Sequence, residues 1–325
     1  MRDFRFGFNF FDIRSREDFV DQCRRGERYG FDVALVPDHL GSPAPFPTMV
    51  AAADATERLR VGSLVLNVPF WNAHLLAREV ASVDRLTGGR LELGLGAGHM
   101  KWEFDEAGIP WEGFGARARR MEETIGELRR LFAADGYEQR AATDERFGLD
   151  TLKPVQRSGF GGYGPPLLVG GTGDRVLRVA AAHADIVAVA GTYQVPGAPP
   201  GTFRLGSAAE AAERVAFVRE QAGDRFPDIE LNVLIQHVQV TADRRGVLTE
   251  MAPRFLPHLT LDEVLDTPFL LVGTEKQIAE QIRESRERFG FTNVTVHAPF
   301  MDTLGPALEH LDQPGATATC TQFVD

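Results

Sequence analysis

The sequence predicts an α/β protein folded as a (β/α)8, or TIM, barrel. Short apolar runs rich in β-branched residues alternate with amphipathic stretches, which is typical of a parallel sheet covered by helices. Eight such runs can be counted, and a chain of 325 residues with 43% hydrophobic positions can bury one large core. Eight strands with seven or eight helices favour a closed barrel, and an open doubly wound sheet is the alternative.

The predicted strands and helices follow in regular order. The strands are expected at residues 4–10, 33–37, 60–67, 90–96, 166–171, 185–191, 231–240 and 293–299. The helices between them have apolar residues at spacings of three and four, and include residues 17–30, 74–89, 116–133, 174–184, 211–223 and 275–290. Several helices end at a glycine suited to a left-handed C-cap, namely Gly30, Gly88 and Gly290.

Two segments interrupt this alternation within a single barrel domain over residues 1–311. Residues 134–165 are polar and glycine-rich, which predicts an insertion with short strands at the mouth side of the barrel. Residues 191–207 carry Pro and Gly where a strand passes into a helix, so a mobile lid is one interpretation and a solvated loop the other. Residues 312–325 have no apolar period and are expected to be a polar tail.

Composition excludes several classes of function. The formal net charge of −11 argues against nucleic acid and anionic membranes as partners, because both require clustered Lys and Arg. No apolar run reaches the roughly 18 residues of a membrane span, so a cytoplasmic location is expected. Cys23 and Cys320 lack the spacing of a zinc site and are too few for a disulfide framework. No metal site is predicted, because no His, Cys, Asp and Glu set has ligand spacing.

Candidate catalytic residues follow the second predicted strand. In a (β/α)8 barrel the carboxyl ends of the strands form the ligand-binding mouth, and this strand ends in Pro37, Asp38 and His39. A carboxylate beside an imidazole can fix its tautomer and make it a general acid or base near neutral pH. In the alternative interpretation Asp38 caps the next helical turn and His39 only packs.

The fourth predicted strand ends in a glycine-rich segment, GLGAGHMKWE. The glycines let the backbone turn sharply or approach a flat ligand, and His99, Trp102 and Glu103 follow them. His99 could face the same pocket as His39 and act as a second proton carrier. A dinucleotide fold is rejected, because the matching acidic residue on a following strand is absent.

A phosphate site is predicted after the fifth strand. The amides of Gly171, Thr172 and Gly173 precede a helix N-terminus, where unpaired N–H groups and the helix dipole favour an anion. Arg175 or Arg178 could add positive charge. A plain tight turn would use the same glycines.

The ordered segments resemble the luciferase-like monooxygenase superfamily, in its branch that uses the deazaflavin coenzyme F420. The resemblance is carried by YGFDVALVPDHL, by RVGSLVLNVPFWNAHLLAREVASVDRLTGGRLELGLGAG with a helix beginning near Asn72, by PLLVGGTGDRVLRVAAAHADIVAV, and by FLLVGTEKQIAEQIRE with NVTVHAP. These segments lie between about residues 4 and 299. The long second segment is the most specific of them.

The resemblance implies roles for individual residues. Asp38 and His39 match a pair that lies against the deazaflavin ring, with His39 as proton donor or acceptor in hydride transfer at C5. Leu64 and Val65 match a non-prolyl cis peptide whose bulge supports the ring, and Asn67 would lie near the ring or its side chain. The phosphate-binding turn is matched by Gly170, Gly171, Thr172 and Gly173.

One position departs from the branch. Its sugar-phosphate dehydrogenases have a carboxylate where this chain has His99, and their cations for the substrate phosphate have no clear counterpart here. A phosphosugar substrate is therefore in doubt, and a catalytic role for His99 gains weight.

Three functions are weighed. The first is an F420-dependent oxidoreductase that transfers a hydride between the deazaflavin and a C=C, C=N or C–OH group, and the Asp38–His39 pair favours it. The alternatives are a reduced-FMN-dependent monooxygenase and a non-catalytic flavin-binding subunit. A homodimer is expected, because luciferase-like proteins often dimerise. A partly apolar small molecule or short peptide is the expected substrate, from a mouth lined by Phe10, Phe46, Phe70, Trp71, Trp102 and Trp111.

Overall fold

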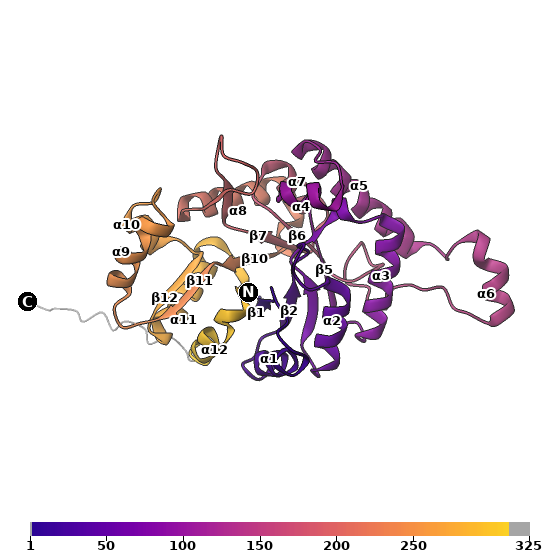
Figure 1. Cartoon of the computed structure of the whole chain (residues 1–325), viewed down its shortest axis with the longest axis horizontal. Coiled ribbons are helices and arrows are strands. Elements are labelled where there is room, and N and C mark those ends of the chain that lie inside the picture. Colours follow the sequence, from indigo (N-terminus) through magenta and orange to yellow (C-terminus); the bar gives the residue numbers. More distant parts are fainter. Residues whose placement is uncertain (1, 312–325) are drawn as a thin grey trace, which may run out of the picture.

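A computed structural model describes residues 2–311 and contains a closed barrel of eight parallel strands (Figure 1). The barrel strands are β1 (Arg5–Asn9), β2 (Val33–Val36), β3 (Arg60–Ser63) continued by β4 (Leu66–Asn67), β5 (Leu91–Gly96), β6 (Leu167–Gly170), β7 (Ile186–Val189), β10 (Glu230–Ile235) and β13 (Phe291–His297). The pairing of β3 with β5, where Val61 lies opposite Leu91, closes the ring. The predicted (β/α)8 barrel is confirmed.

Helices surround the barrel and connect its strands (Figure 1). Several begin with a side-chain cap, as at Asn72, whose Oδ1 accepts hydrogen bonds from the amides of His74 (3.0 Å) and Leu75 (3.3 Å). Gly290 ends another helix at φ +82°, which avoids the steric cost of a Cβ in that conformation. The helices are α1 (Arg16–Arg28), α2 (Pro45–Asp54), α3 (Ala73–Leu86), α4 (Lys101–Ala107), α5 (Phe114–Ala133), α7 (Asp174–His183), α8 (Ala208–Ala222), α11 (Glu275–Phe289) and α12 (Met301–Leu308).

The single strand predicted for residues 231–240 is wrong in its second half. The chain leaves the barrel at Gln236, whose amide donates to the carbonyl of Phe269 (2.8 Å). Beyond it, β11 (His237–Val240) pairs in parallel with β12 (Leu270–Gly273), a strand outside the barrel. With α9 (Arg244–Phe255) and α10 (Leu261–Asp266), these strands lie at one side of the barrel, orange in Figure 1.

The insertion at residues 134–165 is helical, so the predicted short strands are wrong there. It contains a 3-10 turn, η2 (Glu138–Arg140), followed by α6 (Ala141–Phe147), and an isolated bridge between Gly159 and Gly164 is the only β pairing described in it. An ion pair from Arg140 to Asp144 (2.8 Å), one helical turn apart, supports the helix. In Figure 1, α6 projects away from the barrel.

Residues 191–207 form a hairpin at the mouth of the barrel. Its antiparallel strands are β8 (Thr192–Gln194) and β9 (Phe203–Leu205). The amide of Gly206 donates to the carbonyl of Gly191 (2.8 Å) and closes its base. Movement of the hairpin as a lid stays a prediction.

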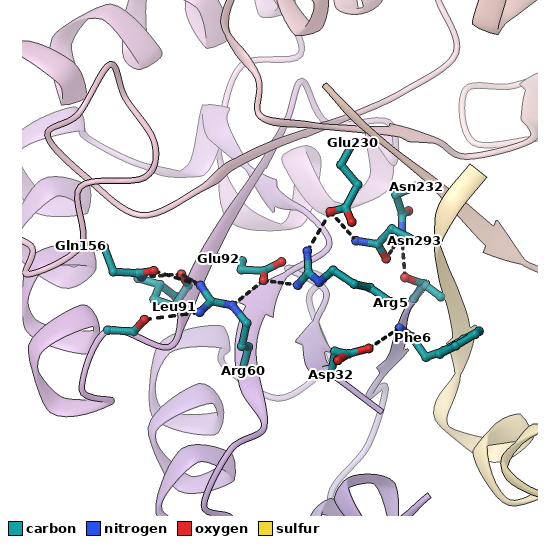
Figure 2. Close-up of polar contacts among 12 residues, drawn as sticks. Arg5, Phe6, Asp32, Arg60, Leu91, Glu92, Gln156, Glu230, Asn232 and Asn293 are labelled. Carbon is teal, nitrogen blue, oxygen red and sulfur yellow. Dashed lines mark hydrogen bonds and ion pairs between the residues drawn. The ribbon is translucent and has the colours of Figure 1, made fainter. Parts of the chain in front are cut away.

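The amino ends of the barrel strands are closed by a polar network, which we call the barrel floor (Figure 2). The carboxylate of Glu92 pairs with both Arg5 and Arg60, at 2.6 Å from Nε of Arg60, and Arg5 also reaches Glu230 at 2.7 Å. Asn293 donates to Glu230 (3.1 Å). The floor therefore fills the amino end of the barrel with paired polar side chains.

Two further findings bear on function. Within residues 2–311, none of the helices combines the length and the apolar character that crossing a bilayer requires. Cys23 is fully buried, and burial raises the pKa of its thiol to about 12, so it is not a reactive thiolate. Cys320 and the predicted polar tail lie outside the described residues.

Candidate active site

A cavity of about 850 Å³ lies at the carboxyl ends of the barrel strands. This is the end where ligands bind in barrels of this kind. The structure brings all the predicted site residues together in its wall, namely Asp38, His39, Leu64, Val65, Asn67, His99, Gly170, Gly171, Thr172 and Gly173.

The cavity wall contains a bulge between β3 and β4. The peptide bond between Leu64 and Val65 is cis, as the resemblance implied. Glycines on the neighbouring strands make room for it, since a Cβ on Gly96 would meet Val65 at 2.5 Å and one on Gly170 would meet it at 3.2 Å. The glycines of the GLGAG segment therefore let one strand approach another, in addition to any role in turning the chain.

Asn67 follows the bulge and has a buried oxygen without a partner. The residue is only 5% exposed and lines the cavity, and its Oδ1 accepts no hydrogen bond within residues 2–311. Gly98, at φ +74°, leaves space for this oxygen, which a Cβ would overlap. A buried acceptor without a donor is costly, so this oxygen suits a donor on a bound ligand.

Asp38 does not hold the ring of His39, which corrects the predicted pairing. Its Oδ2 accepts hydrogen bonds from the indole Nε1 of Trp71 (2.8 Å) and from the amide of Asn67 (3.0 Å). Burial raises the pKa of Asp38, while these two bonds and nearby His39 act in the opposite direction. Asp38 therefore ties the second strand end to the segment after the bulge.

The carboxylate that holds His39 belongs to Glu103 on α4. Its Oε1 lies 2.8 Å from Nδ1 of His39 and also accepts the amide of Leu40 (3.1 Å). Glu103 is 1% exposed, so water cannot replace this contact. Because a carboxylate accepts hydrogen bonds, Nδ1 carries the proton and Nε2 is left for a ligand in the cavity.

His99 stands edge-on to His39, with ring centroids 5.3 Å apart. His99 is exposed within the cavity, and the protein around it lowers its pKa to about 4, mainly by desolvation, with the neighbouring His39 and Arg117 adding to this effect. The ring is therefore neutral near pH 7. A neutral imidazole can donate or accept a hydrogen bond, but it is a poor proton donor.

Arg117 is a cavity residue that the sequence interpretation missed. Its guanidinium stacks on Trp111 at 3.6 Å, and its Nε donates to the carbonyl of Ala97 (3.1 Å). It lies one turn before Met121 on the buried face of α5, and that helical spacing was the available signal. Arg117 places positive charge beside His99.

The predicted phosphate turn lies at the cavity wall, immediately before α7, but its details differ from expectation. The amide of Gly171 donates to Ala188 (3.1 Å), so it is not free for an anion. Arg178 stacks on Phe217, and neither Arg178 nor Arg175 lines the cavity. The cation at the turn is Arg214 of α8, which donates to Asp174 at 2.6 Å.

The predicted aromatic lining of the mouth is mostly wrong. Of the six aromatic residues, Trp111 lines the described cavity, whereas Phe10 is in the core and Trp102 is 52% exposed on α4. Phe46 packs against Trp71, and Phe70 against Phe104. The other aromatic residues in the cavity wall are Phe11, Phe114, Tyr193 and Phe203.

His297 also lines the cavity, with Nδ1 3.0 Å from Oδ1 of Asn9, and burial lowers its pKa. Across residues 2–311, no group of three or more His, Cys, Asp and Glu side chains is placed to hold a metal ion.

Known proteins share this sequence pattern and architecture. A family model described as luciferase-like monooxygenase matches residues 12–293. The chain is 27% identical over 306 residues to the F420-dependent glucose-6-phosphate dehydrogenase of Intrasporangium calvum, covering 87% of this chain and 89% of that one.

Two solved structures show the same fold at 16% identity. An F420-dependent secondary alcohol dehydrogenase in complex with an F420-acetone adduct has a TM-score of 0.70 and covers 96% of this chain and 100% of its own. The FMN-bound oxygenating constituent of 3,6-diketocamphane monooxygenase from Pseudomonas putida has a TM-score of 0.69 and covers 95% and 96%. With the family model matching most of its length, this chain belongs to the luciferase-like monooxygenase family and is a luciferase-like oxidoreductase.

Proposed function

We propose that this oxidoreductase uses coenzyme F420 and transfers a hydride between the deazaflavin and an organic substrate. The observation that carries the proposal is the contact of 2.8 Å between Glu103 and His39. It fixes the imidazole in the tautomer that leaves Nε2 for the substrate, and hydride transfer to or from carbon needs such a proton carrier. The F420 dependence of the relatives is a second support.

The cavity fits a deazaflavin or flavin. Its volume of about 850 Å³ lies toward the upper end of the ~300–1,000 Å³ range of ligand pockets. Val65 would support the ring, the orphaned Oδ1 of Asn67 would accept from a ring N–H or a side-chain hydroxyl, and Thr172 and Gly173 would hold the phosphate at the N-terminus of α7. When bound, a deazaflavin supplies a carbon centre that exchanges hydride and activates oxygen poorly.

Residues of the chain would transfer the proton and orient the substrate. In the oxidising direction, Nε2 of His39 takes the proton of the substrate hydroxyl, while the carbon that bears this hydroxyl loses its hydride and a C=O bond forms. In the reducing direction, Nε2 returns the proton to the oxygen. Glu103 stabilises the imidazolium that forms. His99, neutral near pH 7, can hold the reacting oxygen by a hydrogen bond. The same scheme serves C=N and C=C groups, with nitrogen or carbon as the proton acceptor.

A reduced-FMN-dependent monooxygenase is the second candidate. The phosphate turn and the bulge would hold FMN as well as F420, and the FMN-bound structure shares the fold. The fixed tautomer of His39 favours the first candidate, because it supplies the proton step that hydride transfer requires. A non-catalytic flavin-binding subunit would need neither His39 nor its buried partner.

The test is equilibrium binding of the purified protein to oxidised and reduced F420, with oxidised and reduced FMN titrated in parallel under anaerobic conditions. Micromolar or tighter binding selective for F420 is the expected result. Selective binding of reduced FMN would replace the proposal with the monooxygenase, and binding of none of the four would favour the non-catalytic subunit.

A further inference from the structure

A second cavity, of about 340 Å³, adjoins the active-site cavity on the far side of the β8–β9 hairpin. Thr192, Phe203 and Gln236 line both cavities, so these three side chains form the wall between them. We propose that the second cavity is the substrate subsite for a hydrocarbon group, and that the substrate carries an alkyl chain or apolar ring beside its reacting carbon. This inference rests on the proposed function for the position of the reacting carbon.

Phe203 links the subsite to the catalytic groups. Its ring packs edge-on against His99 with centroids 5.3 Å apart, and it is 37% exposed. A substrate that contacts both His39 and His99 would therefore have Phe203 as a near neighbour, and a group directed past this ring would lie at the second cavity. The size of the second cavity, at the lower end of ligand pockets, suits part of a molecule.

The wall of the second cavity is mainly apolar. Leu205, Leu256 and Leu270 are each at most 7% exposed, and Met251 and Phe255 of α9 complete the apolar surface. Burial of hydrocarbon against such a surface is favourable in proportion to the area removed from water. The chemistry of the wall therefore selects a hydrocarbon group.

The two basic residues in the wall already have partners. Arg204 pairs with Glu210 (3.0 Å) and lies 5.0 Å from the ring centroid of Tyr193. Nε2 of His237 lies 3.2 Å from Oε1 of Gln239. Both basic side chains in this wall are therefore already bound, one to a carboxylate and one to an amide. This argues against a phosphorylated substrate in the subsite.

The three lining residues shared with the active-site cavity favour substrate as the occupant. Phe255 stands at the rim and is 62% exposed, which a protein interface could also use. An interface would cover the rim without needing the shared wall at Thr192 and Phe203 or a cavity behind it. The shared wall therefore favours the substrate group, and a second copy of the chain becomes an outcome that the experiment can reveal.

The experiment measures Kd values for linear 2-alkanones of four to nine carbons, by ligand-observed NMR, with and without F420. Wild-type Kd is expected to fall by about fourfold for each methylene that enters the subsite, the factor equivalent to ~0.8 kcal/mol. Met251→Trp fills the cavity, so long ketones should lose this gain while the shortest bind as in the wild type. Met251→Leu, which nearly conserves volume, should keep the gain.

F420 affinity, measured on the same samples, separates this inference from the proposed function. Loss of the chain-length gain in Met251→Trp supports the subsite even if F420 fails to bind. A gain that persists in a folded Met251→Trp protein, or a wild type without any gain, overturns it.

Phe255→Asp provides a second variant at an exposed position that tolerates charge, should Met251→Trp not fold. It is expected to weaken long ketones more than short ones. If sedimentation instead shows a wild-type dimer that Phe255→Asp dissociates, this face is an interface between copies and the subsite is refuted.

Discussion

The two ends of the barrel hold their carboxylates with different partners. At the floor, Glu92 is shared by two guanidinium groups, and Glu230 binds Arg5 and Asn293. At the mouth, Asp38 accepts from the indole of Trp71, and Glu103 contacts the imidazole of His39. Ion pairs with arginine hold the strands together at the floor, whereas the carboxylates at the mouth position side chains and backbone around the cavity.

Glu92→Ala should give the largest effect in this comparison, and it should be on stability. Removal of the carboxylate leaves Arg5 and Arg60 without their common partner. The free energy of unfolding is expected to fall by about 3 kcal/mol, the lower end of the range for a broken buried pair, since both arginines retain some exposure. Urea denaturation measures it.

The matched control for the floor is Glu57→Ala, which removes an exposed carboxylate and should cost little. Glu92→Ala protein that remains folded should retain the cofactor affinity of the wild type, because the floor lies at the opposite end from the cavity. Reduced cofactor affinity would mean that the two ends are coupled.

His39→Ala comes next and should act on turnover. Loss of the acid or base is expected to lower kcat by ~100-fold, which corresponds to about 2.7 kcal/mol, with cofactor affinity nearly unchanged. Single-turnover reduction of F420 measures the step directly. His74→Ala, at a half-exposed ring on α3, is the control, and unchanged turnover in His39→Ala would remove this ring from the mechanism.

Glu103→Gln should have a smaller effect of the same kind, because we propose that Glu103 acts through its contact with His39. We expect kcat to fall by about tenfold with an unchanged Kd for the cofactor. The double variant with His39→Ala should be no slower than His39→Ala alone, since residues that act as a unit are not additive. Additive losses would show that Glu103 acts independently of His39.

His99 should give the smallest effect, as a pH dependence of stability, because the residue is exposed to solvent in the cavity and water screens its charge. Its pKa is lowered from 6.5 to about 4 in the folded protein, so the unfolded chain binds more protons between these values. The contribution of His99 therefore makes the protein less stable as the pH falls from about 6.5 to 4. His99→Gln removes it, so the variant should gain in urea midpoint relative to the wild type at pH 4.5 but not at pH 7.5.

The architecture was predictable because its signals are local and repeated. Each of the eight predicted strands overlaps a barrel strand, and the barrel geometry then brings strand ends that are distant in sequence to one mouth. This is why His39, His99 and the turn at Gly171 could be expected in one cavity from the sequence alone. The strand over residues 231–240 was too long because two strands separated only by Gln236 give one continuous apolar pattern.

The contacts inside the site were less predictable. Asp38 and His39 are neighbours in sequence, but consecutive side chains of an extended chain point in different directions, so the partner of His39 came from α4. Glu103 was visible in the sequence only as one carboxylate among several. The sequence does not show which way an aromatic side chain near a strand end points. Of the six aromatic residues expected at the mouth, only Trp111 lines the cavity.

The hairpin at the mouth contacts both the phosphate turn, where a cofactor would bind, and the second cavity, where a substrate group would bind. Its Thr192 carbonyl accepts the hydroxyl of Thr172 in the phosphate turn (3.0 Å), and its other strand carries Phe203 at the wall of the second cavity. A cofactor and a substrate would thus press on opposite strands of one hairpin. We expect each to alter the affinity of the other, and equilibrium reciprocity requires both affinities to change by the same factor.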